Sequence, residues 1–285
     1  MKTILKYILP ILIFSLIVSC SKDENNAVAN TIFLHFNNTF KQTPIVLGGA
    51  NSVEATENTS INGQVHHFSE LKYVISNIRL VNAEGEEIPY HINDLDRGAW
   101  VINQAKPETL DCMLEDIPVG TYNQIKFGLG IKPDLNILDE VRFPAFYAAA
   151  GANDTEMMWE WGTGYRFVKI EGFYDEDHKA LSIHTGSTVT GTAGEPDTYT
   201  QGVNAYRDII LTLPDPLVVG NVAGLTIDAD FDKLLSGLTH KIILGTENSS
   251  PSVHSADEMV KFVDNLGGDG STDQSGMFSV GKLEN

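Results

Sequence analysis

The stretch FSELKYVISNIRLV, residues 68–81, is the part of the sequence that best indicates the fold. It is rich in β-branched and aromatic residues, and it is longer than the usual strand of about 5–6 residues. Residues 83–86, AEGE, supply a turn, and IPYHI at 88–92 follows as a second short strand. The sequence therefore predicts a β-hairpin built on one long strand.

Further strand signals lie on both sides of this hairpin. Residues 165–174 alternate, with Phe167, Lys169, Glu171 and Phe173 on one face and apolar residues or glycine on the other. Other predicted strands are residues 32–36, 122–131, 208–213 and 225–231. Short strands separated by turns predict an all-β fold, an antiparallel β-sandwich with long loops.

Two segments have helical features. Residues 140–150 contain alanines and aromatic residues but also Pro144. Residues 255–266 are the better candidate, because apolar residues recur at helical spacing between Ser255 as N-cap and Gly267 as the end signal. We therefore expect a short C-terminal helix.

The first thirty residues predict export and a lipid anchor. Two lysines precede an apolar run, residues 7–18, that is shorter than the ~20 residues needed to span a bilayer, which is typical of a signal peptide. The run ends in LIVSC, which resembles the lipobox of bacterial lipoproteins and implies a lipid on Cys20. We expect a signal peptide over residues 1–19, a lipidated Cys20 with a flexible tether over 20–30, and one β-sandwich domain over 31–285. An ordinary signal peptide or an N-terminal anchor helix is the alternative.

The expected location is the outer membrane, on its periplasmic or cell-surface side, with the lipid bilayer as a partner through Cys20. The residues after that cysteine, KDE at 22–24, resemble the export tag of Bacteroidetes lipoproteins, although a plain solvated tether has the same composition. The formal net charge of −19 argues against nucleic acid and anionic lipid head groups as partners. Of the two cysteines, Cys112 remains without an intrachain partner. We expect a buried, inert thiol there, with a copper thiolate as the alternative.

Candidate chemistry rests on histidine and tryptophan, because the sequence has none of the common enzyme motifs and we expect no catalytic activity. Copper and zinc sites need two or three converging imidazoles, whereas a single histidine is more often a surface or satisfied residue. His66 and His67 are adjacent in a strand and point to opposite faces, so at most one can serve a given site. Trp159 and Trp161 share one face in extended structure, and a packed aromatic cluster is their alternative role.

The stretch MWEWGTGYRFVKIEG, residues 158–172, resembles the most specific segment of the MbnP-like copper-binding proteins. The long strand at 68–80, IPVGTYNQIKFGLG at 117–130 and HTGS at 184–187 resemble other segments of that family in the same order. The resemblance extends from about Thr31 to the C-terminus. It implies an exported β-sandwich of the kind found with methanobactin operons and, in lipoprotein form, in Bacteroidetes.

The resemblance also implies a metal site. His184 and His254 match motif histidines, and we take His66 as the third candidate ligand for copper. Trp159 or Trp161 would be oxidised to kynurenine by a di-haem peroxidase-like partner, and two imidazoles with the kynurenine atom would suit Cu(I). The chain departs from many relatives because no cysteine follows HTGS. The expected function is copper acquisition or handling by a membrane-tethered protein; the alternative is an adhesion or partner-binding sandwich without metal.

Overall fold

The computed structural model describes residues 30–285 except 153–155, 160–163, 193–194, 238, 247–248 and 254–255. The predicted signal peptide, Cys20 and the tether up to residue 29 lie outside the described residues, as do Trp161 and His254. Within the described ranges, no helix has the length and apolar character required to cross a membrane.

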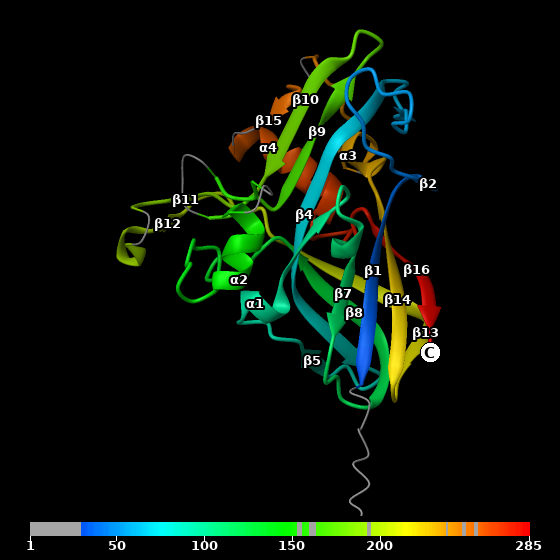
Figure 1. Cartoon of the computed structure of the whole chain (residues 1–285), viewed down its shortest axis with the longest axis vertical. Helices are drawn as coiled ribbons and strands as arrows, with labels where there is room; N and C mark the ends of the chain where they lie inside the picture. The colour runs from blue at the N-terminus through cyan, green and yellow to red at the C-terminus, as the bar shows by residue number, and fades with distance from the viewer. Residues whose placement is uncertain are drawn as a thin grey trace, which may run out of the picture.

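Strand β4 (Val65–Asn82) is the centre of the larger sheet (Figure 1). One edge of β4 pairs first with β9 (Val168–Tyr174) and then with β8 (Gly120–Leu129). Its other edge pairs with β3 (Asn58–Thr59), β6 (Trp100–Asn103) and β5 (Glu87–Pro89). Beyond β8 the sheet continues to β13 (Arg207–Val219), and beyond β9 it continues to β10 (Lys179–Thr185) and β15 (Ser252–Val253). The long strand predicted from residues 68–81 is therefore confirmed.

The smaller sheet consists of β16 (Phe278–Glu284), β14 (Val222–Asp230), β1 (Thr31–Phe40) and β2 (Thr43–Pro44), with β7 (Asp111–Leu114) also paired to β1. The predicted all-β sandwich is confirmed, but its sheets are mixed rather than antiparallel throughout. β1 runs parallel to β14 from the Thr31–Val222 pair to the Thr39–Asp230 pair, and β10 runs parallel to β15. The chain passes from β13 of the larger sheet to β14 of the smaller one, and β14 runs in the same direction as β1. The alternation of residues within a strand does not indicate the direction of its neighbour.

Aromatic side chains join the two sheets. Phe36 of β1 packs edge-on against Tyr73, Phe127 and Phe278, at ring-centre distances of 6.1, 5.9 and 6.5 Å. The buried Tyr73 hydroxyl donates a hydrogen bond of 2.7 Å to Asn38 Oδ1. Burial raises the pKa of Tyr73 well above its usual value. This cluster closes the core where the larger sheet crosses the smaller one.

The helices are short and lie around the sandwich (Figure 1). They are α1 (Leu95–Gly98), α2 (Pro144–Tyr147), which a π-helical turn (Ala148–Ala152) extends, α3 (Lys233–Ser236) and α4 (Ala256–Gly267). Pro144 begins α2 instead of breaking it, because the first position of a helix needs no backbone N–H.

The predicted C-terminal helix is confirmed as α4, whose Met259, Phe262 and Leu266 are buried. It is not the last element of the chain, because β16 follows it and pairs with β14. The sequence analysis did not predict β16. Most of its side chains are exposed or half-buried, and Gly281 and Lys282 interrupt its apolar alternation.

Candidate functional site

The outer face of β4, β9 and β10 carries two rows of polar residues. Lys169 of β9 is the register partner of Lys72 on β4 and of His184 on β10. In the neighbouring row, Glu171 lies between Glu70 and Ser182. Their neighbours in β9 point into the sandwich. The sheet thus brings three strands' polar side chains onto one surface.

The two lysines of this surface are buried and paired with carboxylates. Lys169 Nζ lies 2.9 Å from Glu70 Oε1 and 2.5 Å from Glu156 Oε2. Lys72 Nζ lies 2.6 Å from the same oxygen of Glu70. Burial acts to lower the pKa of Lys169, but the hydrogen bonds to Glu156 and Glu70 outweigh it and raise that pKa above its usual value. The ammonium group of Lys169 therefore stays charged beneath the surface.

A carboxylate holds the imidazole of His184. Nε2 of His184 lies 2.5 Å from Glu171 Oε1, and Ser182 Oγ donates a 3.0 Å hydrogen bond to the same oxygen. Burial acts to raise the pKa of Glu171, but the contacts with His184, Ser182 and the charge of Lys169 outweigh it and lower that pKa. A carboxylate in this position fixes the orientation of an imidazole, as such groups do behind metal-binding histidines.

Trp159 packs beside the end of the strand that carries His184. Its backbone N–H donates to Gly164 O at 3.3 Å, and its indole lies 5.4 Å from the guanidinium carbon of Arg166. Its Cζ2 atom is 3.0 Å from the point where a Cβ on Gly186 would lie. Gly186 is two residues beyond His184, so the buried indole and the imidazole occupy neighbouring positions.

Alanine at Gly186 should displace the Trp159 indole, because the added methyl group would lie 3.0 Å from that ring and 2.6 Å from Tyr165 O. We expect a loss of about 1–3 kcal/mol in the free energy of unfolding, together with a shift in tryptophan fluorescence. Gly220→Ala is the matched control, because no heavy atom lies within 4 Å of its added Cβ. Equal effects of the two substitutions in urea titrations would contradict this packing.

The described chain approaches His184 from a second direction. Strand β15 pairs in parallel with β10, so that Val253 is the register partner of Ile183. Val253, which precedes His254 in the sequence, thus lies beside Ile183, which precedes His184. His254 and Trp161 themselves lie outside the described residues.

The structure does not bring His66 to this site. Its ring lies in the sandwich interior, 5.2 Å from the ring centres of both Phe40 and Phe68, and is 1% exposed. The larger sheet therefore separates His66 from His184, and one metal ion cannot bind both. His67 shares the outer face, but its partner Phe173 is four residues along β9 from Lys169, or about 13 Å.

Burial lowers the pKa of His66 to about 4 from an ordinary 6.5, against an opposing effect of the Gln64 backbone. Below pH 6.5 the His66 imidazole is therefore protonated in the unfolded chain, whereas in the folded protein it becomes protonated only at about pH 4. As the pH is lowered from 6.5 to 4, the preference of His66 for the neutral form should therefore lower the free energy of unfolding progressively, by up to about 3 kcal/mol. Above pH 6.5 it should have no such effect.

The free energy of unfolding of the wild type should fall as the pH is lowered from 6.5 to 4. We expect His66→Phe to make this slope shallower by up to about 1.4 kcal/mol per pH unit, the value that corresponds to one proton. Urea titrations at successive pH values measure the slope. His178→Gln, at an exposed histidine, is the control. An unchanged slope in His66→Phe would show that the pKa of His66 is the same in the folded and the unfolded protein.

Cys112 faces the core and pairs in register with Leu34. Burial raises the pKa of its thiol, so the thiolate that copper would require is disfavoured. The structure thus supports the expectation of an inert cysteine.

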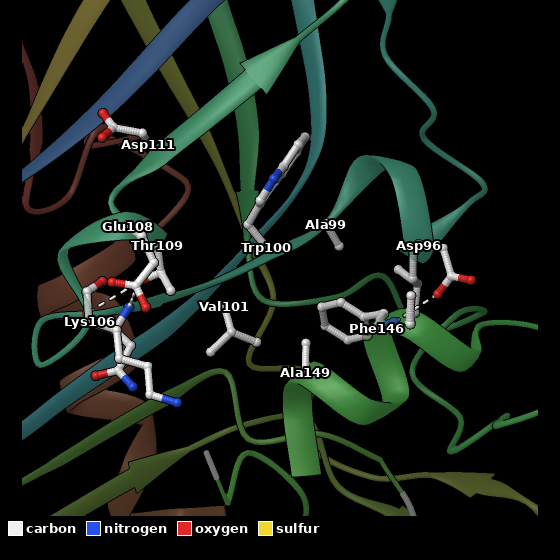
Figure 2. Close-up of a pocket in the computed structure, with 13 residues that line it drawn as sticks. Asp96, Ala99, Trp100, Val101, Lys106, Glu108, Thr109, Asp111, Phe146 and Ala149 are labelled. Atoms are coloured by element: carbon white, nitrogen blue, oxygen red, sulfur yellow. Dashed lines mark hydrogen bonds between the residues drawn. The ribbon is translucent and has the colours of Figure 1, made fainter. Parts of the chain in front are cut away.

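A hollow of about 490 Å³ lies between α1, β6 and α2 (Figure 2). Trp100, Val101, Phe146 and Ala149 line it. The nearby Asp96 carboxylate already accepts a hydrogen bond of 2.8 Å from Phe146 N. This hollow lacks a converging set of imidazoles, and we assign it no role.

Among the described residues, no three His, Cys, Asp or Glu side chains converge as a metal site. The relationship to known proteins comes from the sequence instead, since the MbnP family model matches residues 29–255. The chain belongs to the MbnP family. Comparison with curated proteins gives no match.

Among solved structures, this MbnP-family chain is similar to MbnP from Methylosinus trichosporium, with a TM-score of 0.56 and 16% sequence identity. The similarity covers 89% of this chain and 98% of the other. At this identity the similarity shows that the two share a fold, and the roles of individual residues must be argued from this chain.

The sequence analysis did not single out Glu171, Lys169 or Glu70 as members of the site. The alternation of residues 165–174 placed Lys169 and Glu171 on one face, and this was the available signal. It could not show that the face is buried or that His184 lies across from it, because both depend on strand pairing.

Proposed function

We propose that this MbnP-family protein binds copper and acts in copper acquisition or handling, with no catalytic turnover of its own. The observation that carries the proposal is His184, buried and held by Glu171 next to Trp159. The described residues fit such a site in one respect, since they supply an oriented imidazole in a water-poor position. His184 would hold the metal, and His254, which follows Val253, would supply the second imidazole.

The resemblance to the family adds the proposed modification of tryptophan. Oxidation of Trp159 or Trp161 to kynurenine would give the site a ketone and an aniline nitrogen, and the oxidant would come through a di-haem peroxidase-like partner. Trp159 is the one of the two that lies within the described residues, and its ring lies against Gly186.

Copper content and intact mass, measured on mature protein purified from the native host, test the proposal. We expect about one copper ion per chain and the mass of a kynurenine-containing protein, with copper lost in His184→Ala. His35→Ala is the matched control, because His35 lies at the surface against Asp111. An unmodified mass and no copper in the native-host protein, even after Cu(I) is added, would favour the partner-binding sandwich, whose partner a pull-down would then identify.

Glu171→Gln should weaken copper binding by about 10–100-fold without abolishing it, because the amide no longer fixes His184 as a carboxylate does. Competition with a Cu(I) chelator measures the affinity. Glu87→Gln, which alters a distant surface carboxylate, should leave it unchanged. Equal affinities of Glu171→Gln and the wild type would remove Glu171 from the site.

The proposed location is the outer membrane, on its periplasmic or cell-surface side, through a lipid on Cys20. The same mass measurement should show the lipid. Cys20→Ala should move the protein from the membrane fraction to the soluble fraction, and unchanged membrane association would argue for a different anchor.

A further inference from the structure

The inner face of the β3–β4 hairpin is polar although it faces the interior. Asn58 and His66 are directly opposite each other in register. Ser60 and Gln64 lie two pairs further toward the turn, where Ser60 N donates to Gln64 O at 3.0 Å. Residues two apart in a strand share a face, so all four side chains point the same way, and all four are buried.

The side-chain amide of Gln64 forms hydrogen bonds with Leu244 and Asp175. Leu244 N donates to its Oε1 at 2.8 Å, and its Nε2 donates to Leu244 O at 3.1 Å and to Asp175 Oδ1 at 2.9 Å. Leu244 and Asp175 therefore satisfy one of the four polar side chains.

The other three side chains have no such match in the part of the chain that the structure describes. Neither Nδ2 nor Oδ1 of Asn58, neither ring nitrogen of His66, and not Oγ of Ser60 has a hydrogen-bond partner. A buried polar group without a partner destabilises the folded protein, because it has given up its hydrogen bonds to water. Five such atoms on one hairpin indicate that a ligand satisfies them.

The chemistry of these groups decides the class of ligand. A neutral imidazole, an amide and a hydroxyl offer both donors and acceptors, and none of them carries a charge. These three side chains do not suit a cation, because they include no carboxylate and the amide hydrogens of Asn58 would repel it. Water both donates and accepts, and buried waters commonly make about three hydrogen bonds to such groups.

We propose that the β3–β4 hairpin contains a buried water site in which ordered water bridges Asn58, Ser60 and His66. The aromatic rings of Phe40 and Phe68 wall the imidazole on its apolar sides. The site lies on the opposite face of the larger sheet from His184, so it does not depend on the proposed copper site.

A high-resolution crystal structure of the mature wild-type protein, with anomalous data, tests this. We expect density at water hydrogen-bonding distances from an imidazole nitrogen of His66 and the amide of Asn58. A direct His66–Asn58 hydrogen bond with no density between them would overturn the proposal. A peak with anomalous signal and metal–ligand distances would overturn it in favour of an ion.

A solution measurement on the same protein is independent of crystallisation. The wild type should show cross-relaxation between a His66 ring proton and long-lived water, and Asn58→Leu should lose it. Thr43→Val, at an exposed residue of β2, should retain the signal. Absence of the signal in the wild type counts against the site even if Asn58→Leu does not fold.

Discussion

We expect Phe36→Ala to lower the free energy of unfolding by about 3–5 kcal/mol. Phe36 is fully buried and contacts aromatic rings of both sheets, namely Tyr73 and Phe127 of the larger and Phe278 of the smaller. Alanine would leave a cavity where the sheets meet, and neither sheet can close over it without moving the other. Urea titration gives the value from the shift in midpoint at constant m.

The control lies three residues earlier in the same strand. Phe33 is 43% exposed on the outer face of β1, so Phe33→Ala removes a similar side chain without opening a cavity. We expect a change within about 0.5 kcal/mol. Comparable losses for the two variants would show that Phe36 does not join the sheets as described.

Glu70→Gln should cost about 3 kcal/mol, since removing one partner from a buried ionic group leaves charge uncompensated. Glu70 contacts both Lys72 and Lys169, and these two buried lysines are register partners on adjacent strands. Without the carboxylate, two like charges face each other directly, although Lys169 keeps its contact with Glu156. Urea titration at low and high salt measures the loss.

Glu87→Gln is the matched control, because Glu87 also bridges two cations, Lys126 and Arg79, but at the surface. Exposed pairs contribute about 0–1 kcal/mol and weaken with salt. We expect a small loss for Glu87→Gln that salt removes, and a larger one for Glu70→Gln that persists. A Glu70→Gln loss that salt abolishes would mean that water reaches the lysines.

Local sequence patterns predicted those elements whose stability is local. Residues 68–81 form β4 because β-branched and aromatic residues favour a strand, and α4 forms where apolar residues recur at helical spacing. The parallel pairing of β1 with β14 could not be predicted in this way. It depends on how distant segments meet, and each strand has the same periodicity whichever neighbour it finds.

The candidate site shows the same division. Trp159 and His184 were found from motifs, and the structure places them in neighbouring positions. Periodicity indicated that His66 and His67 point to opposite faces but not which face is interior. Strand β4 is buried on both sides along most of its length, so its apolar residues do not alternate and the sequence has no signal for the choice.

The pairing of the first strand with β14 also affects how the protein reaches its native state. Thr31 and Val222 are separated by most of the chain, so one edge of β1 stays open until β14 has been made. Contacts of such long sequence separation form slowly, because loop-closure entropy must be overcome first. An open strand edge invites pairing with other chains. We therefore expect this edge of the first strand to stay unpaired until β14 has been synthesised, and the yield of the protein to depend on chaperones that shield it.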